Sequence, residues 1–426
     1  MMRFLYSLFL YLSVPLILLR LYLRGKQSPG YRQRIAERFG RFNPAEEYDQ
    51  TQTTIWIHAV SVGETVAAEP LVNAIKQAYP DAQILFTSMT PTGSERAQAL
   101  FGNSVFRSYL PYDLPTAVSR FLNTVNPDLL IIMETELWPN LIHQCHSRGV
   151  KTILANARLS KNSAAGYARI GRTTRTMLQG LNAIAVQSKQ DAKRIEALGA
   201  DPNNISITGS LKFNVEQTMT TERRDPYFSS IKASGRTIIV AASTREGEEV
   251  RVLTAFKKVL EKKPQALLLL VPRHPERFDE VTKQSKKLEL NTLRRSEQTP
   301  VTESTQVIVG DSMGEMASYY SISDIAFVGG SLVDTGCQNV LEPAALALPV
   351  VVGPSQYNFA QICKQLEFVG GLKTVIDVKG LANSLEELID SENKRQQMGA
   401  AARSVIDDNQ QALPNLMKVI NEVFSC

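Results

Sequence analysis

The chain has few of the residues that build disulfide frameworks and metal sites. Its 426 residues include only four histidines and four cysteines, the latter being Cys145, Cys337, Cys363 and Cys426. The cysteines form no C-x-x-C pair and have no even spacing, which favours free thiols in a reducing compartment over a disulfide frame or a zinc site. His143 and His146 flank Cys145 on a predicted helix, but no further ligands cluster nearby, so a polar helix face is the better interpretation. We expect no structural metal.

Several nucleotide-binding signatures are also absent. The sequence has neither a Walker A loop nor a G-x-G-x-x-G turn, which argues against a P-loop nucleotidase and a standard NAD-binding domain. It has no Asp-x-Asp, the kind of carboxylate pair that holds a sugar diphosphate through a divalent cation, so metal-independent chemistry is favoured. The net charge of +5 is modest and no nucleic-acid motif is present. Nucleotides, phosphorylated sugars and anionic lipids remain as ligands that suit this charge.

An apolar segment with a basic flank begins the chain. The run from Phe4 to Leu19 is broken only by Ser7, Ser13 and Pro15. The basic residues that follow it are Arg20, Arg24, Lys26, Arg32, Arg34, Arg38 and Arg41. Spanning a bilayer takes about 20 apolar residues, so the run is marginal as a span but long enough for an anchor. Without an A-x-A-like cleavage site it does not resemble a signal peptide, and we predict an uncleaved anchor at residues 1–25 with the remaining domains in the cytoplasm.

Short β-rich runs alternate with helical patterns from residue 54 onward, which predicts parallel α/β sheets. The strands expected first are Thr54–Val60, Gln83–Ser88, Asp128–Met133, Lys151–Ala155, Ala183–Gln187 and Ile205–Thr208. The second set is Thr237–Ala241, Ala266–Val271, Thr305–Val309, Ile325–Val328 and Val350–Gly353, followed by helices from residue 380 to 424. We therefore predict an N-terminal Rossmann-like domain at 26–210, a linker at 211–235 and a C-terminal Rossmann-like domain at 236–426. Two doubly wound domains with a cleft between them match the GT-B architecture, which epimerases and phosphorylases share.

Candidate chemistry in the first domain lies at the carboxyl ends of predicted strands, where open α/β sheets bind ligands. Glu64 follows the first strand near a helix N-terminus, which can hold a carboxylate ionised, although a first-turn glutamate is also common for purely structural reasons. Glu134 and Glu136 follow the Asp128–Met133 strand, and we expect one to face the ligand and the other to cap the next helix. Lys212, at the start of the predicted linker, could reach across the predicted cleft to a phosphate or carboxylate or could be a solvated surface lysine.

Three loops of the second domain favour a nucleotide. Pro272 and Arg273 follow a predicted strand, where a planar guanidinium suits a phosphate. The turn Gly310–Glu315 precedes a helix, so its backbone N–H groups could face an anion. Phe327–Ser331 and Gly336–Pro343 give a second glycine-rich approach. Asn339 is suited to cap a helix, and Glu342 could accept hydrogen bonds from ribose hydroxyls.

Taken together, the motifs resemble those of the 3-deoxy-D-manno-octulosonic acid (Kdo) transferases of Gram-negative bacteria. The matching stretches are HAVSVGE at 58–64, TSMTPTG at 87–93, YLPYDLP at 109–115, METELWPN at 133–140, NARLS at 156–160, TGSLKFN at 208–214, VPRHPERF at 271–278, GDSMGEM at 310–316, FVGGSL at 327–332 and NVLEPAA at 339–345. The resemblance covers nearly the whole chain. One departure is Gln338, where many relatives are expected to have His.

The resemblance implies a GT-B enzyme that transfers Kdo from CMP-Kdo, with inversion and without a metal or cofactor, to the tetraacyldisaccharide 1,4'-bisphosphate precursor of lipid A (lipid IVA). This reaction belongs to lipopolysaccharide synthesis at the cytoplasmic face of the inner membrane. Glu64 matches the family's catalytic base, and Glu134 and Lys212 match residues that stabilise the transition state. The CMP site would comprise Pro272, Arg273, Met313, Gly314, Glu315, Asn339, Val340, Leu341 and Glu342.

Other interpretations of the residues remain open. Arg32, Arg34, Arg38 and Arg41 are candidates for the phosphates of a lipid acceptor, although attraction to anionic headgroups explains them equally well. A GT-B enzyme that uses a UDP-sugar would fit the fold, as would a membrane-tethered nucleotide-binding protein without catalysis. Competition by CMP but not UDP would exclude the first, and turnover with a lipid acceptor would exclude the second.

Overall fold

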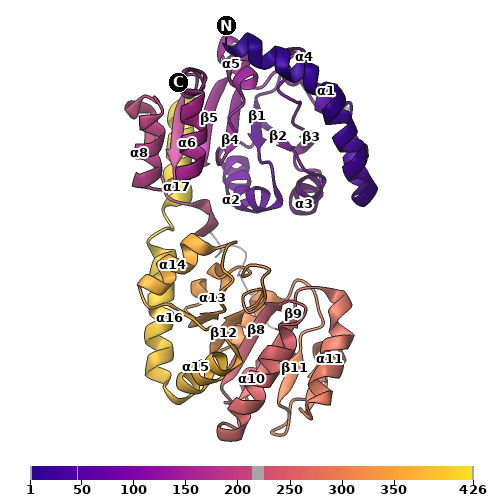
Figure 1. Cartoon of the computed structure of the whole chain (residues 1–426), viewed down its shortest axis with the longest axis vertical. Helices are drawn as coiled ribbons and strands as arrows, with labels where there is room; N and C mark the ends of the chain where they lie inside the picture. The colour runs from indigo at the N-terminus through magenta and orange to yellow at the C-terminus, as the bar shows by residue number, and fades with distance from the viewer. Residues whose placement is uncertain (1, 46, 214–224, 425–426) are drawn as a thin grey trace. The chain divides into compact units, whose positions relative to one another are not determined.

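The computed structural model describes residues 2–45, 47–213 and 225–424, which form two compact units. Unit 1 comprises Met1–Lys212 with Gln411–Cys426, and unit 2 comprises Phe213–Gln410. Each unit contains one seven-stranded parallel sheet with helices packed against it (Figure 1). The predicted pair of doubly wound α/β domains is confirmed.

The sheet of unit 1 has the strand order β3-β2-β1-β4-β5-β6-β7. Its strands are β1 (Thr54–His58), β2 (Gln83–Ser88), β3 (Phe106–Tyr109), β4 (Leu129–Met133), β5 (Lys151–Ala157), β6 (Ala183–Val186) and β7 (Ile205–Ile207). The helices are α1 (Met2–Gln27), α2 (Val62–Ala78), α3 (Pro91–Phe101), α4 (Pro115–Val125), α5 (Pro139–Ser147), α6 (Lys161–Arg169), α7 (Gly171–Gln179), α8 (Lys189–Ala197) and α17 (Ala412–Phe424). Ile55 and Ile57 pack into one hydrophobic core and Trp56 into another, because alternate side chains of a strand point to opposite faces.

The sheet of unit 2 has the strand order β10-β11-β9-β8-β12-β13-β14. Its strands are β8 (Ile238–Thr244), β9 (Leu267–Pro272), β10 (Thr292–Arg294), β11 (Val307–Val309), β12 (Ile325–Val328), β13 (Val350–Val352) and β14 (Leu372–Thr374). The helices are α9 (Pro226–Lys232), α10 (Glu249–Lys262), α11 (Phe278–Lys287), α12 (Met316–Ile322), α13 (Leu341–Ala345), α14 (Ala360–Phe368), α15 (Val378–Asp390) and α16 (Glu392–Asp407). Strands buried on both faces read as continuous apolar runs, as in Leu267–Val271.

Both sheets have a point at which the chain changes direction across the sheet. In unit 1 the strands after β1 add on one side, and β4 then pairs with β1 on the other side. In unit 2 the same reversal occurs between β8 and β12. Ligands of open α/β sheets bind outside the carboxyl ends of the strands at such switch points, so the loops after these four strands are the first places to look for chemistry.

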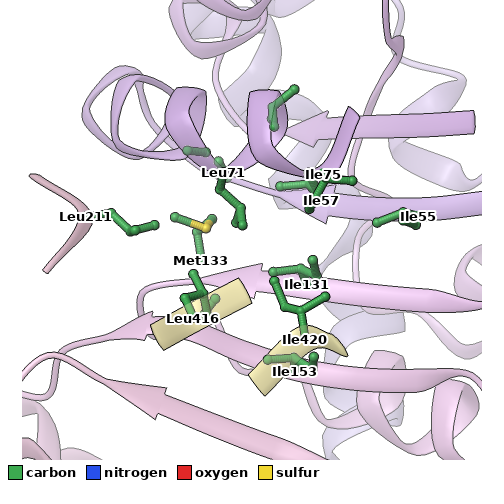
Figure 2. Close-up of a cluster of buried hydrophobic side chains, with 14 of the residues drawn as sticks. Ile55, Ile57, Leu71, Ile75, Ile131, Met133, Ile153, Leu211, Leu416 and Ile420 are labelled. Atoms are coloured by element: carbon green, nitrogen blue, oxygen red, sulfur yellow. The ribbon is translucent and has the colours of Figure 1, made fainter. Parts of the chain in front are cut away.

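The last helix corrects the predicted domain boundary at residue 426. Helix α17 belongs to unit 1, where its apolar face packs against the sheet. Leu416 and Ile420 lie beside Ile131 and Ile153 in this core (Figure 2). The sequence predicted helices from residue 380 to 424 but not which sheet the last of them would cover. The second unit therefore ends near residue 410, and the chain returns to the first.

The predicted linker at 211–235 is also wrong in part. Residues 226–232 form α9, whose Tyr227, Phe228 and Ile231 are buried in a core of unit 2. At the other end, Leu211 is buried in the core of unit 1. The rest of the predicted linker, residues 214–224, lies outside the described residues.

A glycine in α16 gives a test of the packing in unit 2. A Cβ atom on Gly399 would lie 1.9 Å from the carbonyl oxygen of Ala347. Because that oxygen belongs to the backbone, we expect Gly399→Ala to lower the free energy of unfolding by about 1–3 kcal/mol, which thermal denaturation of the full chain would detect. Gly166→Ala in α6 is the control: the added methyl group meets open space, and the variant should be as stable as the parent or slightly more stable. Equal midpoints of thermal denaturation for Gly399→Ala and the parent would contradict the close contact between Gly399 and the Ala347 carbonyl.

Candidate active site

Glu64 lies in the first turn of α2, directly after β1. Ser61 is the N-cap, and its hydroxyl oxygen accepts the N–H of Glu64 while donating to Oε1 of Glu64 at 2.8 Å. The other carboxylate oxygen accepts the N–H of Val60 at 2.9 Å. These reciprocal contacts are a variant of the capping box, with the N–H of Val60 in the place of the N-cap N–H, and they fix the orientation of the carboxylate. Glu64 therefore stabilises the first turn of α2, as a first-turn glutamate often does. The same hydrogen bonds hold its carboxylate in one defined position at the switch point.

Glu134 and Lys212 form an ion pair within unit 1. The Nζ of Lys212 lies 3.2 Å from Oε1 of Glu134, and both side chains are partly exposed. Glu134 follows β4 and has a φ of 56°, in the left-handed region that non-glycine residues avoid at a cost on the order of 1–2 kcal/mol. Its N–H nevertheless donates to the carbonyl of Ala155, which holds this turn against β5. Strained backbone of this kind is typical of functional sites.

The position of Lys212 depends on its neighbour in the chain. The N–H of Leu211 donates to Oδ1 of Asn156 at 3.1 Å, and the Leu211 side chain is buried in the core of unit 1. Asn156 itself has a φ of 52° at the end of β5. The segment that carries Lys212 is therefore fixed to the carboxyl edge of the sheet, beside β4.

The electrostatics of this edge are set by three carboxylates around one lysine. Burial raises the pKa of Glu64, the charge of Glu134 raises it further, and Lys212 opposes both effects. Burial also raises the pKa of Glu136, and the charges of Glu64 and Glu134 add to this shift. The structure thus places Glu64, Glu134, Glu136 and Lys212, all candidates from the sequence, near one another at this edge of the sheet.

The expectation that one of the two acids after β4 caps the next helix is wrong. The N-cap of α5 is Trp138, which makes no side-chain cap. The cap comes from Asp113, whose carboxylate oxygens accept the N–H groups of Asn140 and Leu141 at 2.9 and 2.8 Å. Sequence reasoning missed Asp113 because it lies 27 residues before the helix that it caps.

His58 of the HAVSVGE motif has a structural place. Its ring is fully buried at the end of β1, and Nδ1 lies 2.9 Å from the hydroxyl oxygen of Thr87. Burial lowers the pKa of His58 to about 4, so the ring is neutral at physiological pH. A neutral, enclosed imidazole supports the strand end that precedes Glu64.

In unit 2, two of the predicted donor-binding side chains converge. Arg273 is exposed directly after β9, and its charge lowers the pKa of Glu342, whereas burial raises that pKa more strongly. The Glu342 carboxylate accepts a hydrogen bond from Nδ2 of Asn339 at 3.0 Å, and Oδ1 of Asn339 accepts the N–H of Leu341. Asn339 and Glu342 therefore fix the start of α13 beside an exposed guanidinium.

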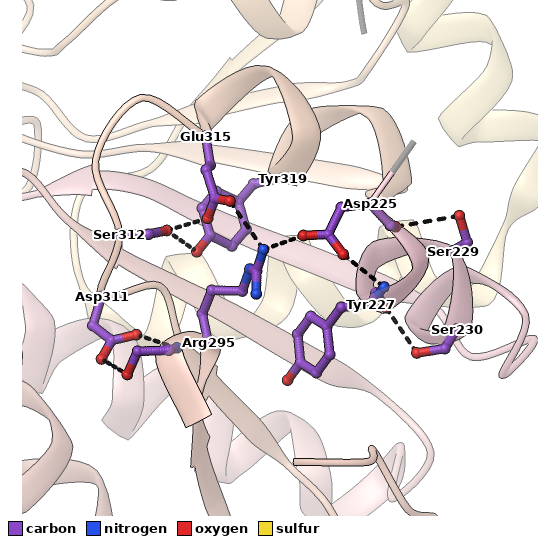
Figure 3. A network of polar contacts seen from close by, with 10 residues as sticks. Asp225, Tyr227, Ser229, Ser230, Arg295, Asp311, Ser312, Glu315 and Tyr319 are labelled. Atoms are coloured by element: carbon purple, nitrogen blue, oxygen red, sulfur yellow. Dashed lines mark hydrogen bonds and ion pairs between the residues drawn. The ribbon is translucent and has the colours of Figure 1, made fainter. Parts of the chain in front are cut away.

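Glu315 of the predicted CMP site is engaged in a polar network (Figure 3). Its carboxylate accepts hydrogen bonds from the Ser312 hydroxyl and from Arg295, and Arg295 also pairs with Asp225 at the start of α9. Beside it, Gly314 has a φ of 82° and Met313 is exposed. The loop 312–315 thus presents Met313 and Gly314 outward, while Glu315 is held by the protein itself.

Three backbone N–H groups of the glycine-rich loop after β12 are already bonded within the protein. The buried carboxylate of Glu248 accepts the N–H groups of Gly330, Ser331 and Leu332 at 2.6, 3.0 and 2.8 Å. A protein side chain therefore occupies the place that a phosphate would take. The residues at 329–332 support the switch point of unit 2 and are not its anion site.

Sequence reasoning also missed Arg245, which follows β8 at that switch point. Its guanidinium hydrogen-bonds to Nε2 of His274, the residue next to Arg273. The signal was available, because an arginine directly after a predicted central strand lies at the ligand edge of the sheet.

Three of the four arginines considered for lipid phosphates bind within the protein. Arg38 is buried and stacks on Tyr109 with its guanidinium carbon 4.0 Å from the ring centre. Arg34 pairs with Glu37 at 2.7 Å, and Arg32 donates to the carbonyl of Tyr22. Basic residues near an apolar run are therefore not all headgroup ligands, because several serve to dock the segment that carries them.

The described cysteines are free and buried. They are Cys145, Cys337 and Cys363. Over residues 2–45, 47–213 and 225–424, no group of three His, Cys, Asp or Glu side chains is arranged to hold a metal ion.

Comparison with known proteins identifies the family of the chain. The family model described as 3-deoxy-D-manno-octulosonic-acid transferase matches residues 33–215, and that described as glycosyl transferases group 1 matches residues 232–405. A 3-deoxy-D-manno-octulosonic acid transferase of Haemophilus influenzae is 44% identical over 99% of this chain and 98% of its own length. The enzyme of the same name from Bordetella pertussis is 36% identical over 94% of this chain and 95% of its own.

The structural neighbours share the fold at low sequence identity. A putative UDP-N-acetylglucosamine 2-epimerase from Listeria monocytogenes superposes with a TM-score of 0.58 at 15% identity, covering 88% of this chain and 97% of that one. This likeness concerns the fold alone, whereas the two curated relatives match across nearly the full length at much higher identity. The chain belongs to the 3-deoxy-D-manno-octulosonic acid transferase family and is a glycosyltransferase.

Proposed function

We propose that this enzyme transfers Kdo from CMP-Kdo to the tetraacylated disaccharide bisphosphate precursor of lipid A, with inversion at the anomeric carbon, at the cytoplasmic face of the inner membrane. The observation that carries the proposal is the Glu64 carboxylate, fixed by two hydrogen bonds at the switch point of unit 1 beside the Glu134–Lys212 pair. Its support is the family membership together with the match of each of these residues to the family's motifs.

In the proposed reaction Glu64 acts as the general base. Its carboxylate takes the proton from an acceptor sugar hydroxyl as that oxygen forms a bond to the anomeric carbon of Kdo. The bond between that carbon and the CMP phosphate oxygen breaks on the opposite face, and CMP leaves with the bonding electron pair. Burial supports this role, because a carboxylate with a raised pKa is a stronger base than one in water.

Lys212 and Glu134 are proposed to stabilise the transition state. The sugar acquires positive charge as its bond to CMP lengthens, and the departing phosphate acquires negative charge. A carboxylate and an ammonium group 3.2 Å apart supply both signs of charge with little reorganisation during the reaction.

We propose that unit 2 binds the CMP part of the donor through Pro272, Arg273, Met313, Gly314, Glu315 and Asn339–Glu342. The exposed Arg273 suits the phosphate, and the fixed Glu342 carboxylate suits ribose hydroxyls. The donor has a single phosphate, which joins cytidine to Kdo, and no diphosphate for a cation to chelate. We therefore propose that neither a metal nor a cofactor takes part.

The direct test is incubation of the protein with CMP-Kdo and the lipid precursor, followed by mass spectrometry of the lipid. The expected result is a lipid heavier by the mass of one or more Kdo units, with CMP but not UMP or UDP as an inhibitor. Inhibition by UDP with no Kdo adduct would favour a UDP-sugar enzyme. An unchanged lipid with intact CMP binding would favour a nucleotide-binding protein without catalysis.

Arg273→Ala should weaken binding of CMP by about 10- to 100-fold, because a hydrogen bond to a charged group is worth about 1.5–3 kcal/mol. Binding of cytidine, which lacks the phosphate, should be unchanged, and isothermal calorimetry measures both. Lys286→Ala, an exposed cation on α11, is the matched control and should bind CMP like the parent. Equal CMP affinities for Arg273→Ala and the parent would remove Arg273 from the phosphate site.

A further inference from the structure

Helix α1 is attached to unit 1 along one face. Its less exposed residues gather on one side of the helix, as expected for a face that packs against a surface. They are Tyr6, Ser7, Leu10, Ser13, Val14, Ile17, Leu21 and Gly25. Figure 1 shows α1 running along the outer side of unit 1 next to α4. The helix therefore contacts α4 and α5 through its N-terminal half, while its C-terminal half contacts residues 29–32, which follow it in the chain.

Polar contacts fix the N-terminal half of α1 to unit 1. The hydroxyl of Ser7 donates to Oδ1 of Asn140 at the start of α5, and Nδ2 of Asn140 lies 3.1 Å from the Ser7 oxygen. The hydroxyls of Tyr11 and Thr116, the latter on α4, are 2.8 Å apart. Asn140 is only 3% exposed and its N–H is held by the Asp113 carboxylate. This attachment is part of the polar interior of unit 1.

The opposite face of α1 is apolar and open. Phe4, Phe9, Leu12 and Leu16 are 67–72% exposed. Further exposed apolar residues of the helix are Leu5, Leu8, Leu18, Leu19 and Leu23. Exposed basic residues follow towards the C-terminal end of the helix: Arg20, Arg24 and Lys26. An apolar face with adjoining cations is complementary to a bilayer surface that contains anionic lipids.

By length and composition α1 could cross a membrane. A crossing helix with its basic end in the cytoplasm would, however, carry Ser7 about 20 Å into the bilayer, at 1.5 Å per residue from Arg20. Asn140 and Thr116 would have to follow into hydrocarbon, or their contacts with α1 would have to break. Unpartnered polar groups in a bilayer core cost several kcal/mol each, so either outcome is unfavourable.

We infer that α1 does not cross the bilayer but lies along its surface, with its outer apolar face among the lipids of an anionic membrane and its inner face on α4 and α5. This orientation keeps the contacts of Ser7 and Tyr11 with unit 1 and buries the exposed leucines and phenylalanines in lipid. The inference deepens the proposed function, on whose membrane location it rests, by making one side of unit 1 the membrane-bound surface. Residues near both ends of α1 are then on the same side of the membrane.

Spin labels on the outer face of the full-length protein test this orientation. In a Cys426→Ser background, where the described native thiols are buried, Phe4→Cys, Leu12→Cys and Leu19→Cys would each carry a nitroxide. Power saturation with oxygen and a nickel chelate then measures label depth in vesicles of phosphatidylglycerol and phosphatidylethanolamine. Lys258→Cys on α10, an exposed position of unit 2, is the aqueous control.

The expected result is a similar shallow lipid depth at all three positions. A maximum at Leu12 with water-exposed labels at Phe4 and Leu19 would show a crossing helix and overturn the inference. Labels in water at all three positions would also overturn it, because the outer face would then have no lipid partner. Kdo transfer measured on the same samples separates the two proposals: transfer with a crossing profile defeats only this inference, and shallow labels without transfer defeat only the proposed function.

Discussion

Glu64→Gln should lower the rate of Kdo transfer by about 10²- to 10⁴-fold, the range that a well-placed general base contributes. Glutamine keeps the shape of the side chain, and its carbonyl oxygen can still accept the N–H of Val60, so the start of α2 should persist. An amide cannot take up the acceptor proton at neutral pH. Turnover measured with CMP-Kdo and lipid acceptor should therefore fall while the affinity for CMP stays the same.

Glu69→Gln is the matched control for this variant. Glu69 lies on the same helix, outside the capping box, and its replacement should leave transfer unchanged. Calorimetric titration with CMP on both variants shows whether unit 2 is intact. Full turnover by Glu64→Gln would remove Glu64 from the mechanism, whatever its hydrogen bonds.

Lys212→Met should lower the turnover number by about 10²- to 10³-fold, similar to the loss of one preorganised group that stabilises transition-state charge. It should also move the acidic limb of the pH–rate profile. Lys212 lowers the pKa of Glu64, so without it that pKa rises and the base is protonated at higher pH. Activity should therefore be lost sooner as pH falls, and the limb shifts to higher pH.

Glu134→Gln provides the opposing shift. The charge of Glu134 raises the pKa of Glu64, so its removal lowers that pKa and moves the acidic limb to lower pH. A general loss of folding would not shift the acidic limbs of the Lys212→Met and Glu134→Gln profiles in opposite directions. Profiles that move together, or not at all, would contradict the electrostatic link between this ion pair and Glu64.

The sequence predicted the central strands well and the edge strands poorly. The missed strands β3, β10 and β14 lie at sheet edges, are three or four residues long and are only partly buried. An edge strand pairs on one side only and needs no continuous apolar run, so its pattern is weak. The central strands are buried on both faces, and their apolar runs are visible in the sequence alone.

The candidate site shows the same division between local and long-range information. Glu64, Glu134 and Lys212 follow strand ends or family motifs, so the sequence indicated each of them. The burial of Arg38 and the hydrogen bonds from the glycine-rich loop to Glu248 depend on contacts between distant segments. Glu248 and Gly330, for example, are separated by 82 positions in the sequence. Side chains paired across such separations could not be assigned from local pattern.

The anomeric configuration of the transferred Kdo tests the central claim most directly. In the proposed reaction the acceptor oxygen, deprotonated by Glu64, attacks the face opposite to CMP. Nuclear magnetic resonance of the lipid product from a single turnover should therefore show a configuration inverted relative to CMP-Kdo. A product of retained configuration would contradict direct displacement with Glu64 as the base.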